Sequence, residues 1–202
     1  MAKRPQNNRR KILDAALDCA AEARWGDVSL SKIAKEADVS LKQLYAEFAS
    51  KADIVAAIIV QTTTSVVEGT DPSAADEPAH DRLLDAILRR FDALAPHKAA
   101  VTSILRDMPL DPLTSLRLMP NYFDAMAWVL ESAGISSTGL AGRIRTKGLA
   151  VINLAAMGIW IRDDTADLTK TMAFLDRRLK QAVQVAAFLP FGVVNRTADK
   201  AD

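Results

Sequence analysis

The sequence predicts an all-α protein, and three observations support this fold class. Of its 202 residues 50% are hydrophobic, yet only 5% are aromatic. Ala, Leu, Val and Ile supply most of the apolar content, and they recur at helical spacing in segment after segment. No segment alternates apolar and polar residues as a half-buried strand would, and no internal repeat is present. The length allows one domain with a sizeable core or two small ones.

Charge and cysteine content narrow the class of protein further. A net charge of +1 excludes a bulk polycation, so any contact with nucleic acid must be local. The single cysteine, Cys19, cannot form an internal disulfide and indicates a reducing compartment. No apolar run reaches the roughly 18 residues of a membrane span, and the basic start leads into an amphipathic segment. We therefore expect a cytoplasmic protein that does not insert into membranes.

The first third of the chain is expected to form four short or medium helices. Their expected ranges are 9–24, 30–37, 41–48 and 52–68. Gly26 is expected to cap the first of them, and Ser29 and Ser40 are good N-caps for the next two. Two short helices joined by a tight turn form a candidate helix-turn-helix, whose second helix can enter the major groove of DNA.

The rest of the chain begins with segment 68–79, which is rich in Gly, Pro, Ser and acids and predicts a loop. Pro120 is expected to kink the helix that contains it. The helix over 139–161 is the most apolar and has a surface of small residues. Five helices are expected in this part, over residues 81–94, 98–108, 113–133, 139–161 and 168–189.

A set of residues around the candidate helix-turn-helix has a specific combination of spacings. Its members are Gly26, Ser29, Ile33-Ala34, Ala37, Val39-Ser40, Leu44-Tyr45, Phe48 and Ser50-Lys51. Over roughly residues 9–58 the chain resembles the TetR family of bacterial transcriptional regulators. The resemblance implies a three-helix DNA-binding domain over 1–58, a larger helical effector-binding and dimerisation domain over 59–190, and a C-terminal tail over 191–202.

The resemblance also implies which residues contact double-stranded DNA. Gln43 matches the position best placed for a base edge, where an amide can pair with adenine. Tyr45 and Lys51 match positions that touch the DNA backbone, and Lys42 could do either. Capped helix N-termini can also meet a phosphate. The expected DNA-binding residues are Ser29, Lys32, Ser40, Leu41, Lys42, Gln43, Tyr45 and Lys51.

The chain departs from the family pattern at several positions. Lys42 stands where the family usually has Gly or Ala, and Asp38 stands where it usually has Gly. Ala46 and Glu47 stand where aromatic residues, His or Arg are common. A carboxylate at position 47 would be repelled by phosphate, unless a basic neighbour neutralises it or its rotamer turns away.

The larger domain of the family binds a small, often apolar effector. Residues of this kind also form ordinary cores, and Asn153 could anchor a ligand or bond to a neighbouring backbone group. The candidate effector-binding residues are Phe91, Met119, Phe123, Met126, Asn153, Met157 and Trp160. For a homodimer the family points to a four-helix interface that includes the 139–161 helix. The candidate dimer residues on the last helix are Met172, Leu175, Leu179 and Ala182.

A second resemblance leads to an alternative function. The segment RRFDALAPHKAA, the acids after Trp160 and the run Thr171–Leu179 are similar to the lipid-binding protein of coenzyme Q biosynthesis. That family shares the TetR architecture, binds isoprenoid lipids and presents them to a hydroxylase. The first resemblance implies a repressor released by a small apolar effector. The second implies a lipid- or isoprenoid-binding protein with little or no DNA binding.

An enzyme is not expected. The only histidines, His80 and His97, have no metal-ligand spacing to each other or to Cys19. No glycine-rich phosphate loop and no nucleophile with a matching base can be identified. The acids that follow Trp160 are expected to be solvated or to cap a helix; they are Asp163, Asp164 and Asp167. We therefore expect no catalytic residues, no metal and no cofactor.

Overall fold

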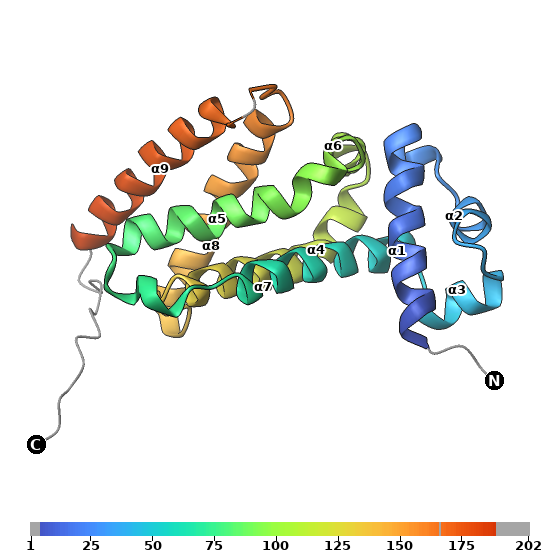
Figure 1. Cartoon of the computed structure of the whole chain (residues 1–202), viewed down its shortest axis with the longest axis horizontal. Coiled ribbons are helices and arrows are strands. Elements are labelled where there is room, and N and C mark those ends of the chain that lie inside the picture. The colour runs from blue at the N-terminus through green and yellow to red at the C-terminus, as the bar shows by residue number, and fades with distance from the viewer. Residues whose placement is uncertain (1–4, 166, 189–202) are drawn as a thin grey trace, which may run out of the picture.

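The computed structural model describes residues 5–165 and 167–188, and within these ranges it is all-α with no strand, as predicted (Figure 1). The helices are α1 (Pro5–Glu22), α2 (Leu30–Glu36), α3 (Leu41–Glu47), α4 (Lys51–Glu68), α5 (Ala79–Leu94), α6 (Lys98–Asp107), α7 (Pro112–Ser132), α8 (Gly139–Trp160) and α9 (Thr169–Phe188). The 3-10 turns are η1 (Trp25–Asp27), η2 (Pro72–Asp76), η3 (Ala95–His97) and η4 (Met108–Leu110). The expected C-terminal tail lies outside the described residues.

The molecule is elongated, and its helices run in several directions (Figure 1). Helix α1 crosses one end of the molecule, with α2 and α3 on its outer side, while α4, α5 and α7 run lengthwise away from it. Helices α8 and α9 lie towards the opposite end. None of the described helices is long and apolar enough to cross a bilayer.

Two clusters of buried side chains hold this arrangement together. The first core joins α1–α4 to η1, α6 and α7; its larger members include Ile12, Trp25, Ile33, Leu44, Phe48, Ile54, Ile104 and Leu118. The second core joins α4 to α5–α9; its larger members include Val66, Ile87, Phe91, Met126, Leu130, Met157, Trp160, Leu175 and Leu179. Helix α4 belongs to both, because Ile58 lies in the first core, Val66 in the second, and Ile59 packs against both. The domain boundary expected after residue 58 therefore falls inside a continuous helix.

Local capping explains the short helices. The Ser29 side chain accepts the Lys32 N–H, and Ser40 forms a reciprocal capping box with Gln43. Between α2 and α3, Asp38 has a φ of 53°, the left-handed conformation that asparagine and aspartate tolerate better than most residues. This conformation explains how Asp38 replaces the glycine that is usual at this turn.

Gly26 does not cap the first helix, which ends earlier, at Glu22. It lies instead within η1, where its N–H donates to Asp107 Oδ2 at 2.6 Å. The glycine is needed because of this close approach: a Cβ at position 26 would lie 3.1 Å from the same carboxylate oxygen. In α7, the helix continues through Pro120.

Candidate nucleic-acid interface

Helix α3 presents an exposed face on the outer side of α1 (Figure 1). Leu44 is buried and anchors α3 in the first core, whereas Tyr45 is 72% and Leu41 54% exposed. Lys42 and Gln43 are exposed as well. From neighbouring segments, Ser29, Lys32 and Ser40 are also exposed. The fold thus places seven of the eight expected DNA-binding residues, all except Lys51, on open surface.

Gln43 is engaged in the capping box at the start of α3. The side-chain Oε1 of Gln43 accepts the backbone N–H of Ser40 at 2.8 Å, and the backbone N–H of Gln43 donates to Ser40 Oγ at 3.2 Å. A bidentate pair with adenine needs both ends of the amide, and so would break this cap. The geometry favours a contact in which the Nε2 amino group alone donates to a base acceptor.

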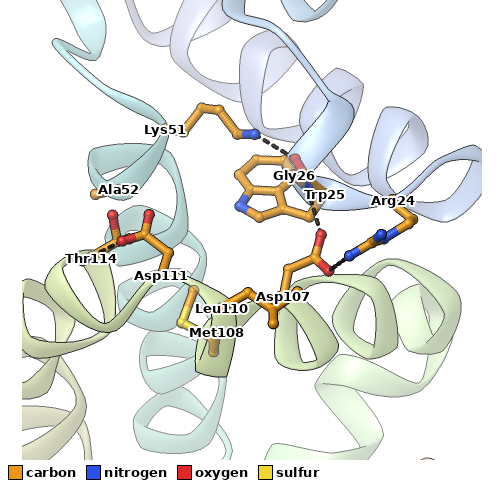
Figure 2. Close-up of a pocket in the computed structure, with 10 residues that line it drawn as sticks. All are labelled: Arg24, Trp25, Gly26, Lys51, Ala52, Asp107, Met108, Leu110, Asp111 and Thr114. Carbon is orange, nitrogen blue, oxygen red and sulfur yellow. Dashed lines mark hydrogen bonds and ion pairs between the residues drawn. The ribbon is translucent and has the colours of Figure 1, made fainter.

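Lys51 is directed into the molecule, not towards the exposed face of α3. Its ammonium donates to the Trp25 carbonyl and lies 4.5 Å from the centre of the Trp25 ring. Burial lowers the pKa of Lys51, which shows that the ammonium is partly removed from water. Figure 2 shows this side chain over the junction between the helix-turn-helix and the larger domain. A DNA-backbone contact by Lys51, as expected from the sequence, would require this side chain to turn away from Trp25, and the contact stays a prediction.

The unusual carboxylate at position 47 is turned towards α1. Arg9 Nη1 lies 3.9 Å from Glu47 Oε2 and donates to the Glu47 carbonyl at 3.4 Å. The Arg9 guanidinium also lies 4.5 Å from the centre of the Phe48 ring. A basic neighbour and a turned rotamer, the two conditions that reconcile Glu47 with a DNA-binding surface, are both present.

We expect Glu47→Gln to change DNA affinity little, because an exposed ion pair of this kind contributes only about 0–1 kcal/mol. The measurement is a titration of DNA with wild type and variant at the same salt concentration. Ala46→Glu provides the control, since it adds a carboxylate at the adjacent exposed position. This control should weaken binding by about 1 kcal/mol or more. A marked tightening by Glu47→Gln would show that Glu47 faces phosphate.

Asp107 at the end of α6 clamps the turn that leads into the helix-turn-helix (Figure 2). Its Oδ2 accepts the Gly26 N–H, and its Oδ1 accepts Arg24 Nη2 at 2.9 Å. These hydrogen bonds, first that from Arg24, hold the pKa of Asp107 below its usual value. One turn earlier, Ser103 accepts the Trp25 N–H at 2.9 Å. Helix α6 is therefore bonded directly to the DNA-binding part of the chain.

A pocket of about 280 Å³ opens beside this clamp (Figure 2). Its walls come from η1, the start of α4, and the segment from α6 to α7, and they include Trp25, Lys51, Asp107, Met108 and Asp111. Sequence reasoning missed Asp107, because Gly26 was interpreted as a helix cap and not as the partner of a distant carboxylate. The pocket lies away from the residues expected to bind an effector.

Most of the expected effector-binding residues meet in the second core. Phe91, Met126, Met157 and Trp160 are buried there, with the rings of Phe91 and Trp160 5.6 Å apart between centres. Phe123 packs against this core, while Met119 is half-buried on α7. They form a packed interior, as side chains of these types usually do.

Asn153 is fully buried on α8 and faces Tyr122 of α7. The Tyr122 hydroxyl lies 2.8 Å from Asn153 Oδ1 and 3.1 Å from the Ala150 carbonyl. Burial raises the pKa of Tyr122 to about 12, so the hydroxyl stays neutral and donates. The Nδ2 amino group of Asn153 has no hydrogen-bond partner among the described residues.

Of the four residues expected to form the dimer interface, two are buried inside the chain and two are exposed. Leu175 and Leu179 are 0% and 1% exposed and belong to the chain's own second core, so they are not available to a partner. Met172 and Ala182 are exposed on α9. The stripe on α9 was assigned to the dimer because a helical period identifies an apolar face without saying what covers it.

Helix α8 has the larger uncovered apolar face. Leu140, Ile144, Val151 and Leu154 are each about half exposed or more, although the opposite side of the same helix is buried. A Cβ at Gly148 would meet nothing within 4 Å, which leaves the surface open at that point. At helical spacing these positions share one side of α8. We call this surface the α8 stripe.

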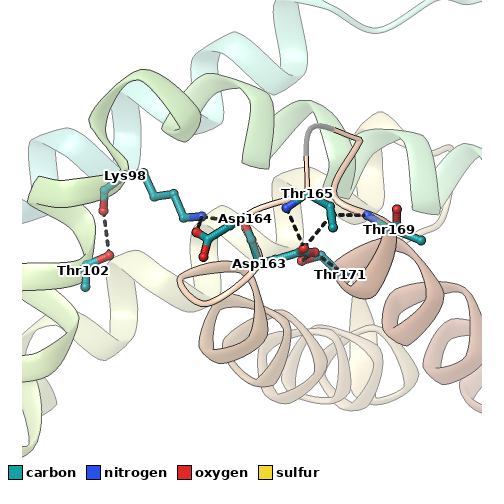
Figure 3. A network of polar contacts seen from close by, with 7 residues as sticks. All are labelled: Lys98, Thr102, Asp163, Asp164, Thr165, Thr169 and Thr171. Atoms are coloured by element: carbon teal, nitrogen blue, oxygen red, sulfur yellow. Dashed lines mark hydrogen bonds and ion pairs between the residues drawn. The ribbon is translucent and has the colours of Figure 1, made fainter.

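Among the acids after α8, which were expected to be solvated or to cap a helix, Asp163 bonds to the start of α9, whereas Asp164 is solvated (Figure 3). Asp163 is buried; its Oδ1 accepts the Thr165 hydroxyl at 2.6 Å, and its Oδ2 accepts the N–H and hydroxyl of Thr171. These hydrogen bonds, the Thr165 hydroxyl first, hold the pKa of Asp163 well below its usual range. Lys98 donates to the Asp163 carbonyl at 2.7 Å and lies 3.7 Å from the Asp164 carboxylate. No described group of three His, Cys, Asp or Glu side chains could hold a metal ion.

The depressed pKa of Asp163 predicts acid sensitivity. The folded state favours the ionised carboxylate, so its stabilisation is complete above the unfolded pKa of about 3.9 and is lost as the pH falls below it. Urea unfolding of wild type and Asp163→Asn, followed by circular dichroism, should show a large difference in unfolding free energy at neutral pH and a smaller one at acid pH. A difference that does not change with pH would contradict this account.

These features define a class of protein: an all-α chain with an exposed helix-turn-helix at one end and a larger helical domain at the other. Residues 12–58 match the family model "Bacterial regulatory proteins, tetR family", and residues 114–186 match the family model "COQ9". Both family resemblances stated from the sequence are confirmed, but the segment RRFDALAPHKAA, on which the second partly rested, lies outside the matched residues 114–186. The N-terminal part is a TetR-type helix-turn-helix domain, and the C-terminal part is COQ9-like.

Solved structures of TetR transcriptional regulators share the fold. One from Nitrosomonas europaea ATCC 19718 is 24% identical, with a TM-score of 0.71 over 87% of this chain and 98% of that one. One from Rhodococcus sp. RHA1 is 19% identical, with a TM-score of 0.67 over 87% and 95%. A tetR-family regulator from Streptomyces coelicolor is 18% identical, with a TM-score of 0.62 over 93% and 84%. No curated protein sequence matches the chain significantly.

Proposed function

We propose that this protein is a homodimeric transcriptional regulator that reads double-stranded DNA with α3. The exposed face of this helix carries the proposal. The large side chains of Tyr45 and Leu41 are exposed to solvent, while the buried Leu44 anchors the same helix. Lys42 adds a positive charge to the exposed face. A helix held by its buried side and open on the other is the geometry that fits a major groove.

A dimer is required because one short helix reads only a half-site. Two-fold symmetry places two such helices about 34–36 Å apart, or at a multiple of that spacing. The α8 stripe is the surface we assign to the interface, since it is largely apolar, with the exposed Lys147 between Ile144 and Val151, and lies far along the chain from α3. Its open glycine allows the equivalent helix of a second copy to approach closely.

We further propose that an effector in the second core releases the protein from DNA. Helix α4 belongs to both cores, and α6 is bonded to the turn before α2 through Asp107. A ligand that separates helices of the second core would therefore move both connections. It changes DNA affinity only if it binds the two conformations unequally.

The test is a titration of the DNA upstream of the protein's own gene at several salt concentrations. Sequence-selective binding that weakens with salt is expected. Lys42→Ala should weaken all sequences alike and reduce the salt slope by about 1. Gln43→Ala should change base preference by less than the roughly 1–3 kcal/mol of a bidentate contact, because only Nε2 of Gln43 is free to donate. Lys170→Ala, an exposed lysine on α9, is the matched control and should change neither. If both α3 variants bind like wild type, α3 does not read DNA.

A second candidate function is supported by the COQ9 match over residues 114–186. In that case the second core would hold a lipid, and α3 would have little or no role in DNA binding. Lipid that copurifies with the protein, together with no salt-dependent DNA shift for wild type, would favour the carrier over the regulator.

A further inference from the structure

A buried arginine that has no carboxylate partner among the described residues lies between α4 and α5. Arg90 is 3% exposed, on the side of α5 that also buries Ile87 and Leu94. Its one hydrogen-bond contact among the described residues joins Nη1 to Thr63 Oγ1 of α4 at a long 3.5 Å, and its Nε has none. A guanidinium remains protonated inside proteins, so α5 carries a cation into the interior.

The part of the chain that the structure describes supplies no anion for this cation. No carboxylate in the described part of the chain forms an ion pair with Arg90. The hydroxyl of Tyr122 is the titratable group that influences it, and burial keeps that hydroxyl neutral. A buried charge without a partner is strongly unfavourable, and native proteins normally pair such groups.

A second donor without a partner among the described residues lies on Asn153, which contacts Tyr122. Asn153 of α8 is fully buried, and its Oδ1 accepts the Tyr122 hydroxyl at 2.8 Å, which leaves Nδ2 with no described partner. Three buried donors among the described residues have no hydrogen-bond partner: Arg90 Nε, Asn153 Nδ2 and Arg89 Nε. The Arg89 guanidinium has other partners, Asp85 and the Gly69 carbonyl, so Arg90 and Asn153 are the two that concern the interior. Buried polar groups are nearly always hydrogen-bonded, so a missing acceptor is the common explanation of both.

The surroundings of these donors are apolar and adaptable. Phe91 follows Arg90 on α5, and Met126 and Met157 lie in the same second core. Methionine side chains rearrange easily around an irregular apolar group. The site therefore combines a cation suited to bidentate binding of a planar carboxylate with a packed apolar interior whose methionine side chains would rearrange to admit hydrocarbon.

We propose that Arg90, assisted by Asn153, binds the carboxylate of an amphipathic effector whose apolar body lies in the second core. The inference rests on the proposed function and narrows it, because the effector becomes an organic anion and not a purely apolar molecule. It also links the site to DNA binding: Thr63 and Lys51 belong to one continuous helix, so a ligand that draws Arg90 away from Thr63 acts on α4.

The sequence contained a signal for this site. Leu83, Ile87, Arg90 and Leu94 follow one another at helical spacing, so Arg90 occupies a position of the apolar stripe of α5. A charged residue at a core-facing position is the feature that marks a buried polar site.

The experiment compares dodecanoate with 1-dodecanol, which has the same chain and no charge, by calorimetric titration of full-length protein below micellar concentrations. We expect wild type to bind dodecanoate at least about tenfold more tightly than 1-dodecanol. A hydrogen bond between charged groups contributes more binding free energy than one to a neutral hydroxyl, and the difference corresponds to about this ratio of dissociation constants. Arg90→Met should remove this preference, leave alcohol binding within about twofold, and raise the thermal midpoint of the unliganded protein.

Arg89→Gln is the matched control. It removes the same charge from the adjacent residue, whose guanidinium pairs with Asp85 at the surface, and it should keep the preference for dodecanoate. Should Arg90→Met fail to fold, Asn153→Leu replaces it and must also reduce the preference. Equal affinity of wild type for both probes, binding of neither, or a preference that survives in Arg90→Met would overturn the proposal.

A DNA titration of the same preparations separates this inference from the proposed function. Selective dodecanoate binding without DNA binding would support the anion site and reject the regulator. DNA binding without selective dodecanoate binding would reject the anion site and leave the regulator in place.

Discussion

Replacing Val151 by Glu is expected to convert the dimer to monomers and to abolish tight operator binding. Val151 is 70% exposed in the middle of the α8 stripe, and two-fold symmetry would bring two carboxylates together in a dry interface. The fold of each chain should survive, because surface substitutions usually change unfolding free energy by less than about 0.5 kcal/mol. Binding would fall towards the non-specific level, a loss of about 10³-fold or more.

Sedimentation velocity measures the mass of the variant, and a DNA titration measures the loss of affinity. Val60→Glu is the matched control, since it makes the same substitution at an exposed valine of α4 outside the stripe. This control should remain dimeric and bind DNA like wild type. A Val151→Glu protein that still sediments as a dimer would show that another surface forms the interface.

Replacing Leu175 by Ala is expected to have the opposite pattern, a large loss of stability with the dimer retained. Leu175 is completely buried in the second core. Removing a leucine side chain from such a position leaves a cavity and costs about 2–5 kcal/mol of unfolding free energy. Urea unfolding at fixed protein concentration measures this loss, and sedimentation at low urea measures the oligomeric state.

Met172→Ala is the appropriate comparison on the same helix. Met172 is 39% exposed, so its truncation removes much less buried surface and should cost less than about 1 kcal/mol. If Leu175→Ala dissociated the dimer without lowering the stability of the monomer, α9 would contribute to the interface through the residues that the sequence pattern first suggested.

The two substitutions separate what a helical pattern reveals from what it conceals. Both α8 and α9 have apolar residues at helical spacing, and each pattern is correct as evidence for a helix. The pattern on α9 belongs to the interior, whereas part of the pattern on α8 is left in water. Periodicity gives the direction of an apolar face relative to its own helix, but it contains no information about the neighbour that covers that face.

The helix-turn-helix was predictable because its determinants are local. Ser29 and Ser40 bond to backbone groups within three residues of themselves, so the caps are encoded in short segments of sequence. The exposed residues of α3 follow from the position of Leu44, which must face the first core. The spacing of these residues also identified the family, and the C-terminal resemblance was found in the same way.

The tertiary structure decided which partners the long polar side chains contact. Lys51 turns to Trp25, 26 residues away, Glu47 turns to Arg9, 38 residues away, and Asp107 holds Gly26, 81 residues away. Such contacts depend on how helices pack, and packing is set by the whole core and not by neighbours in sequence. The sequence by itself therefore determined the helices, the Ser29 and Ser40 caps and the family of the helix-turn-helix domain. Only the tertiary structure decided which charges meet and which apolar faces remain uncovered, because burial is a property of distant segments brought together.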